Sequence, residues 1–215
     1  MSSLIQMQAV IEAPHYKNEF SCPWETPEFQ PFSMIRLHGE MTYQEIGLVF
    51  AQLAQYNQIE LAGDLLTVLN QIIEAESLIL PGGIQVIDEL QNIISPSCCC
   101  GLETWREWVD FLKTGETPWL GHDPSPFVEN RDNVVRIWSD GGIDYSAGQS
   151  VNNAFYYIDV SRDRFAKALI LVEQDLQAFL FCIDSWAKEV GFRESSKLCQ
   201  KFDECFNFKN DYGQR

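Results

Sequence analysis

Residues 154–190 read AFYYIDVSRDRFAKALILVEQDLQAFLFCIDSWAKEV. The first seven residues are rich in aromatic and β-branched side chains, which favours a strand. From Ser161, which we expect to cap a helix, apolar side chains recur at spacings of three, four and seven. They are Phe165, Leu169, Val172, Leu176, Phe179, Leu180, Ile183, Trp186 and Val190. A strand followed by an amphipathic helix about 45 Å long indicates an α+β fold.

Further strands are expected before this segment. Residues 127–129 and 134–138 are β-prone and flank four polar residues, a pattern that predicts a β-hairpin. Residues 4–11 and 36–38 are two more strand candidates. Residues 84–94 stay open between strand and helix, because their β-branched side chains also fall at helical spacing. We therefore expect a small, mostly antiparallel sheet.

Helix signals fall between these strands. Thr42 and Glu45 have the spacing of a capping box, and apolar residues continue at helical spacing through Ile73, as two helices or one kinked helix. Residues 102–113 and 194–206 predict two further helices. There is no internal repeat, low-complexity tract or linker, so we expect residues 1–215 to form a single α+β domain.

The charge balance limits the partners. Fifteen basic residues face 31 acidic ones, a formal net charge of −16. Such a field repels nucleic-acid phosphates and anionic lipid, so we expect neither nucleic acid nor membrane as a partner, while a basic protein or a metal cation is permitted. The sequence predicts no signal peptide and no membrane span, and an odd number of cysteines does not suit a disulfide framework. A cytoplasmic location is expected.

Catalytic motifs are missing from the sequence. It contains neither G-x-S-x-G nor a glycine-rich phosphate loop, so we assign no catalytic residue and no cofactor. Cys98, Cys99 and Cys100 are adjacent, whereas zinc sites typically pair cysteines two to four residues apart with a second pair elsewhere. Here the first pair of zinc ligands would be Cys98 and Cys100, and no second pair follows. Because a buried cysteine behaves as a small apolar residue, we expect the run to pack in the core and assign no metal ligand.

The segment GHDPSP at residues 121–126 is a second candidate. A histidine beside an aspartate suits acid–base chemistry, but Asp before Pro is also a turn signal, so catalysis, binding and a structural turn all stay open. Glu129, Asp140 and Asp144 follow closely and could supply carboxylates to a metal, with ordinary surface acids as the alternative. Five aromatic side chains are expected to pack together in a small core: Trp105, Trp108, Trp119, Phe127 and Trp138.

The central stretch resembles a group of bacterial proteins of uncharacterised function. The shared pattern is CCCGL at 98–102, W-x-x-W at 105–108, WLGHDPSP at 119–126 and WSDG at 138–141. This resemblance covers about a fifth of the chain and implies no activity. Small acidic α+β proteins of this kind are also similar to immunity proteins of bacterial toxin systems, by analogy of class alone.

These observations favour a non-enzymatic protein-binding module of the immunity type, which would occlude a basic toxin surface. Charge would steer the encounter and a few rings would supply affinity. The expected binding residues are Trp119, His122, Asp123, Glu129, Trp138 and Asp140. The alternative is a metal-binding protein or metal-dependent hydrolase centred on His122 with Asp123, Glu129 or Asp140. A thiol from the Cys98–Cys100 run is a further candidate ligand of that site. A third is a subunit of a larger assembly that uses the 161–190 helix as an interface.

Overall fold

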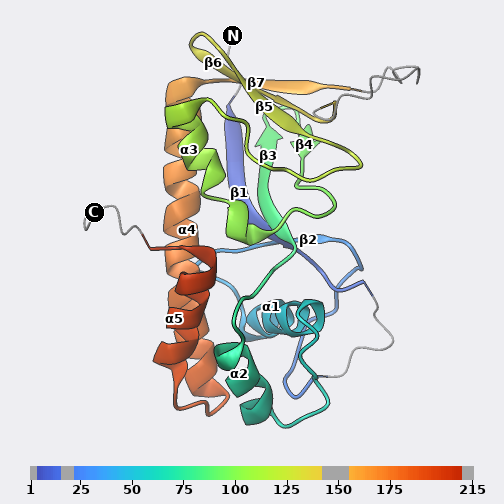
Figure 1. Cartoon of the computed structure of the whole chain (residues 1–215), viewed down its shortest axis with the longest axis vertical. Coiled ribbons are helices and arrows are strands. Elements are labelled where there is room, and N and C mark those ends of the chain that lie inside the picture. The colour runs from blue at the N-terminus through green and yellow to red at the C-terminus, as the bar shows by residue number, and fades with distance from the viewer. Residues whose placement is uncertain (1–3, 16–21, 142–154, 210–215) are drawn as a thin grey trace. The chain divides into compact units, whose positions relative to one another are not determined.

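The computed structural model describes residues 4–15, 22–141 and 155–209 (Figure 1). Helices and antiparallel strands alternate irregularly along the chain, so the α+β prediction is confirmed. Asp144, one of the predicted carboxylates, lies outside the described residues. The elements in order are β1 (Ile5–Glu12), β2 (Met34–Arg36), α1 (Tyr43–Tyr56), α2 (Leu65–Glu74), β3 (Gly82–Asp88), β4 (Ile93–Ile94), the 3-10 helix η1 (Leu102–Thr104), α3 (Glu107–Thr114), β5 (Phe127–Arg131), β6 (Val134–Trp138), β7 (Tyr157–Ser161), α4 (Arg162–Glu189) and α5 (Ser195–Phe206).

The chain divides into two compact units. Unit 1 comprises residues 1–9 and 82–172, and unit 2 comprises residues 10–81 and 173–215. The helix α4 and the strand β1 each contribute residues to both units. The single domain expected from the sequence stays a prediction, and each unit is described by itself.

The predicted hairpin is the centre of unit 1. Strands β5 and β6 pair antiparallel from Phe127 opposite Trp138 to Arg131 opposite Val134, so the turn between them has two residues and not four. Strand β7 pairs antiparallel with the other edge of β6, which completes a three-stranded sheet. Side chains alternate across this sheet: one face is buried and the other is at least partly exposed. The buried face consists of Val128, Val135, Ile137, Ile158 and Val160.

Helical elements of unit 1 pack around Phe165 of α4. The rings of Trp108 and Phe111, both on α3, lie 5.9 Å from the Phe165 ring by centroids. The single helix expected over residues 102–113 is two elements, η1 and α3. The break follows from hydrogen bonding, because the Thr104 hydroxyl and amide both donate to the Gly101 carbonyl and hold that turn in the tighter 3-10 form.

Residues 84–94, which the sequence left open, lie largely in two strands. The strand β3 pairs antiparallel with β4, and the four-stranded sheet has the order β2–β1–β3–β4. The Asp88 side chain accepts the amide hydrogens of Leu90 and Asn92 in the intervening turn. These bonds stabilise the reversal, which selects strand over helix.

Unit 2 has a helical, ring-rich core. The capping box predicted from Thr42 and Glu45 begins α1. Of the two alternatives, two helices or one kinked helix, the structure has two separate helices, α1 and α2. The Phe50 ring on α1 stacks on Trp186 of α4 at 4.5 Å, and Phe202 of α5 lies 5.1 Å from Phe50. Every apolar position predicted within α4 is buried, which indicates that its stripe packs against the protein interior. Val190, the last predicted position, lies beyond the end of α4 and is only half-buried.

Candidate functional site

The cysteine run lies beside the GHDPSP segment. The amide of Ser97 donates to the Leu120 carbonyl at 2.8 Å, and the amide of His122 donates to the Cys98 carbonyl at 3.0 Å. The Ser97 hydroxyl donates to the His122 carbonyl at 2.8 Å. Cys98 and His122 thus form a short antiparallel bridge, which brings together two segments 24 residues apart in sequence.

This bridge assembles a cluster of two thiols and an imidazole. One potential ligand atom each from Cys98, Cys99 and His122 lies within 4.8 Å of the others, and the two sulfurs are 3.5 Å apart. Within residues 4–15, 22–141 and 155–209, this is the one group of three potential metal-ligating side chains. We call it the dithiol–imidazole cluster.

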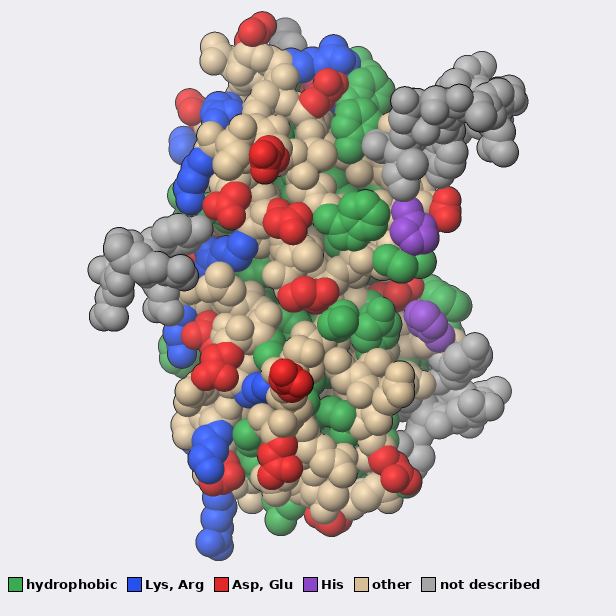
Figure 2. All heavy atoms as spheres, in the orientation of Figure 1, with side chains coloured by type: hydrophobic (Ala, Val, Ile, Leu, Met, Phe, Trp, Pro, Cys, Tyr) green, Lys and Arg blue, Asp and Glu red, His purple; other side chains and the backbone are tan. Residues whose placement is uncertain are grey.

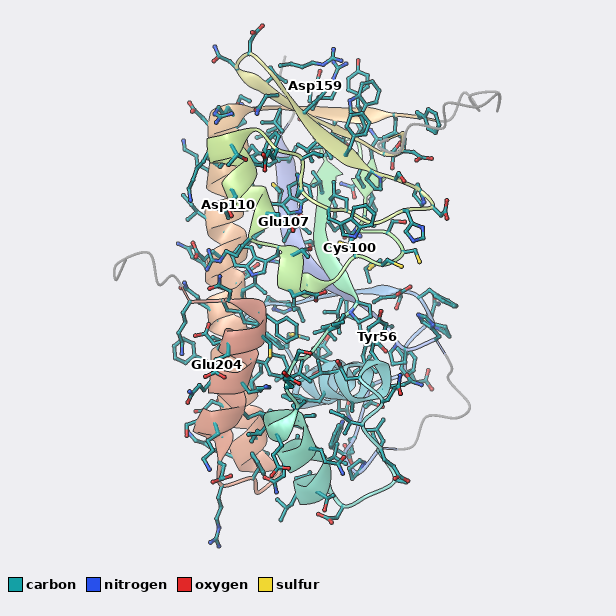
Figure 3. All side chains as sticks on the ribbon, viewed as in Figure 1. Tyr56, Cys100, Glu107, Asp110, Asp159 and Glu204 are labelled. Atoms are coloured by element: carbon teal, nitrogen blue, oxygen red, sulfur yellow. The ribbon has the colours of Figure 1, made fainter. Side chains whose placement is uncertain are left out.

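The cluster corrects two expectations. Cys98 and Cys99 are exposed, and only Cys100 packs in the core. The sulfurs that approach each other belong to Cys98 and Cys99, not to Cys98 and Cys100. Burial raises the pKa of the Cys100 thiol to about 12, so this side chain stays protonated at neutral pH. Figure 3 labels Cys100 among the side chains of the described residues.

Three of the six predicted binding residues lie at or beside this cluster. The Trp119 side chain is 43% exposed, and its indole nitrogen donates to the Cys99 carbonyl at 3.0 Å. The Trp119 amide donates to Glu107 of α3 at 2.7 Å. The His122 Nδ1 atom is 3.1 Å from the Asp123 carboxylate. Trp119, His122 and Asp123 therefore lie together beside the two exposed cysteines, and their role in binding stays a prediction.

Two others lie on the outward face of the three-stranded sheet. Phe127, Trp138 and Tyr157 are direct cross-strand neighbours there, with ring centroids 5.8 Å and 5.0 Å apart, and we call them the aromatic row. Glu129, the next outward residue on β5, accepts the Trp138 indole hydrogen at 2.8 Å. This bond, helped by Arg131, lowers the pKa of Glu129, so the carboxylate stays ionised.

Asp140 has a structural role. One of its carboxylate oxygens accepts the amide hydrogens of Ser125 and Gly141, both at 2.7 Å. Asp140 and Glu129 have separate partners and are not in the one group of potential metal ligands found among the described residues. The third carboxylate of that set, Asp144, lies outside the described residues, so the set as a whole stays a prediction.

The five aromatic residues expected to form one small core do not stay together. Trp105 and Trp108 are buried, whereas Trp119 is exposed beside the cysteines. Phe127 and Trp138 stack on each other on the outward face of the sheet. The reason is strand alternation, because both residues share a face with Glu129 and Arg136 and not with the buried valines and isoleucines.

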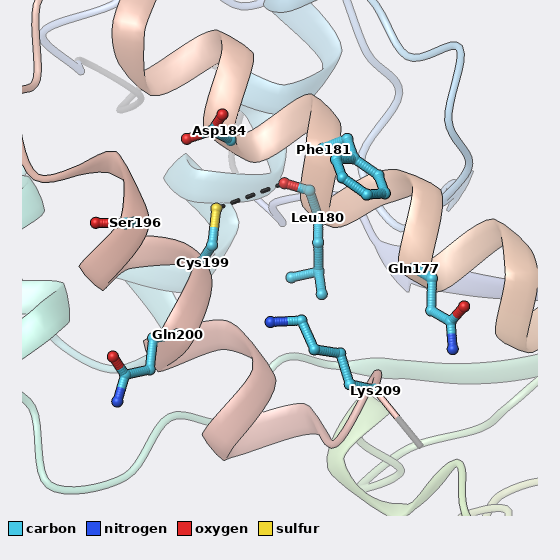
Figure 4. A pocket seen from close by; sticks show the side chains of 8 residues that line it. All are labelled: Gln177, Leu180, Phe181, Asp184, Ser196, Cys199, Gln200 and Lys209. Carbon is cyan, nitrogen blue, oxygen red and sulfur yellow. Dashed lines mark hydrogen bonds between the residues drawn. The ribbon is translucent and has the colours of Figure 1, made fainter. Parts of the chain in front are cut away.

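A hollow on α4 and α5 in unit 2 has no counterpart in the sequence predictions. Its volume is about 710 Å³, and its walls include Leu180, Phe181, Cys199 and Lys209 (Figure 4). Burial raises the pKa of the Cys199 thiol to about 11, and its sulfur donates to the Leu180 carbonyl. A protonated, hydrogen-bonded thiol is a poor nucleophile, so Cys199 is not activated for attack in this hollow.

Figure 2 shows acidic side chains spread over the visible surface, with hydrophobic side chains exposed at several places between them. None of the helices in the described parts of the chain has both the length and the apolar character that a membrane span requires. Comparisons of the chain with models of known protein families, with curated proteins and with solved structures gave no match.

Proposed function

We propose that this chain is a non-enzymatic binding protein for a basic partner protein, of the toxin-neutralising kind. The observation that carries this proposal is the aromatic row of Phe127, Trp138 and Tyr157 on the outward face of the sheet. Large rings are enriched among the residues that dominate protein–protein affinity.

The aromatic row is held rigid before any partner arrives. The Arg136 guanidinium lies 3.6 Å from the centre of the Tyr157 ring and 5.3 Å from that of Trp138. Two hydrogen bonds of 2.7 Å fix the same guanidinium on Asp159. A preorganised ring surface loses little side-chain entropy on binding, which favours affinity.

The partner is expected to be basic because of the charge of the whole chain. Arg136 is paired with Asp159 and Arg131 with Glu129, so charges next to the aromatic row are locally balanced. The excess of 31 acidic over 15 basic residues acts at longer range. It would steer a cationic protein toward the surface, where the rings then supply short-range contact. The mechanism is occlusion of the partner's own functional surface.

The test removes one ring. Tyr157 is 46% exposed, so Tyr157→Ala should leave the fold intact while weakening binding about 30-fold, as expected for a central aromatic contact. Tyr43→Ala is the matched control, because Tyr43 is 51% exposed in unit 2. Tagged wild-type and variant proteins are used to capture partners from the source cell, with thermal unfolding of each as a check on folding.

The proposal requires that a basic protein is captured by wild type and by Tyr43→Ala and is depleted with Tyr157→Ala. Co-expression of the chain should also relieve any toxicity of that protein. Equal capture by all three baits, or capture of acidic proteins alone, would overturn the proposal.

A further inference from the structure

We infer that the dithiol–imidazole cluster is a zinc-binding site, with Cys98, Cys99 and His122 as three ligands and the fourth position open to water. This inference is independent of the proposed protein binding. It rests on the distances within the cluster, on the chemistry of the three side chains and on the way the backbone holds them.

The distances fit one ion. Two thiolates on a tetrahedral zinc, each about 2.3 Å from the metal, lie about 3.8 Å apart. The Cys98 and Cys99 sulfurs are 3.5 Å apart, and the third ligand atom, on His122, is within 4.8 Å of both. Small side-chain rotations are therefore sufficient to place all three atoms on one ion.

The backbone at Cys99 explains how adjacent cysteines can share a metal. In an extended strand, neighbouring side chains point to opposite faces. Cys99 instead has a φ of +65°, in the left-handed region that residues other than glycine rarely adopt. This turn brings its sulfur to the same side as that of Cys98. The Trp119 indole, which donates to the Cys99 carbonyl, stabilises the turn.

The ligand types select a thiophilic cation. Two thiolates and one imidazole match the sulfur and nitrogen ligands of zinc and do not suit Mg²⁺ or Ca²⁺, which prefer oxygen. Cys98 and Cys99 are exposed, so an ion can reach them from solvent. Cys100 is excluded, because its side chain is buried and its sulfur donates to the Trp119 carbonyl.

Asp123 is the positioning residue of the site. Its carboxylate is 3.1 Å from His122 Nδ1. In the tautomer in which Nδ1 carries a hydrogen that the carboxylate accepts, Nε2 is the nitrogen with a free lone pair for an ion. A carboxylate behind a metal-bound histidine fixes the ring and increases its basicity. With three protein ligands, the fourth tetrahedral position is available to an exchangeable water.

Direct binding experiments test the site. The full chain is purified under reducing conditions, stripped with a chelator and titrated with Zn²⁺ against a chromophoric competitor. We expect one equivalent to bind, more tightly at higher pH because the thiols release protons. Titration with Co²⁺ should give thiolate charge-transfer absorption together with the visible bands of tetrahedral cobalt.

Each ligand substitution should weaken Zn²⁺ binding by more than about 100-fold: Cys98→Ser, Cys99→Ser and His122→Ala. This loss exceeds that typical of substituting a residue that only hydrogen-bonds to a ligand. The two cysteine variants should also reduce the charge-transfer absorption. Cys182→Ser and His15→Ala are matched controls in unit 2 and should leave the affinity unchanged. Thermal unfolding without metal checks that every variant folds.

Asp123→Asn separates positioning from ligation. It should weaken Zn²⁺ binding by about 10-fold to 100-fold while the cobalt spectrum keeps its tetrahedral, thiolate-bound form. The inference is overturned if wild type binds no Zn²⁺ more tightly than the Cys98→Ser variant does. It is also overturned if the control substitutions weaken binding as much as the three ligand substitutions.

Discussion

Gly121 shows at the scale of one residue how the cluster depends on backbone contact. Its φ is +95°, and a Cβ atom there would lie 2.6 Å from backbone atoms of Ser97 and Cys98. Only a residue without a side chain permits the two segments to approach as closely as they do. The close approach that Gly121 permits also places the imidazole of the next residue, His122, beside the thiols.

We expect Gly121→Ala to lower the free energy of unfolding by more than about 2 kcal/mol, because it combines backbone strain with a backbone clash. It should also abolish Zn²⁺ binding by separating His122 from Cys98. Gly141→Ala is the control: its φ is +104°, but among the described residues the nearest contact for a Cβ is the Phe127 ring at 3.8 Å. Chemical unfolding measures the free energy of unfolding of both variants. An equal decrease in the two variants would contradict a special role for Gly121.

The same residues show how far the sequence could indicate the cluster. A thiol from the Cys98–Cys100 run beside His122 was one alternative, but the combination of Cys98 with Cys99 was not predicted. The presence of Trp119, His122 and Asp123 in one site was expected, because they are neighbours in the chain. Cys98 and His122 are paired by an isolated β-bridge between residues 24 apart in the chain. No periodic pattern in the sequence indicates such a long-range pair. The side to which the Cys99 sulfur points depends on a positive φ that no cysteine pattern indicates.

At the scale of elements, local signals were sufficient where one interaction decides the structure. The capping box predicted the start of α1, because Thr42 and Glu45 satisfy each other's backbone amides without help from distant residues. The β5–β6 hairpin and α4 followed from alternation and helical spacing. The prediction of one helix over residues 102–113 was wrong. The Thr104 hydroxyl donates to the Gly101 carbonyl, and the spacing of apolar residues does not indicate such a bond.

Thr42→Ala should lower the free energy of unfolding by about 1 kcal/mol, because the Glu45 amide loses its side-chain acceptor. Thr42→Ser keeps the hydroxyl and should retain nearly all of the wild-type stability. Urea unfolding followed by circular dichroism measures both. Equal stability of Thr42→Ala and Thr42→Ser would show that the capping box contributes nothing to α1.

At the scale of the whole molecule, charge and rings have separable effects on binding. The net charge of −16 acts over the Debye length and affects the rate of encounter, so its effect decreases as salt is added. The aromatic row acts only in contact, so its loss affects the rate of dissociation. A single kinetic experiment on the proposed basic partner can therefore examine both parts of the account.

The most direct measurement is the association and dissociation rate of that partner at about 0.05 M and about 0.5 M salt, for wild type and Tyr157→Ala. The account predicts that the association rate falls at least about 10-fold in high salt for both proteins. It also predicts that Tyr157→Ala accelerates dissociation and leaves association unchanged. An association rate that does not change with salt, or a dissociation rate that is the same for wild type and Tyr157→Ala, would contradict the proposed mechanism.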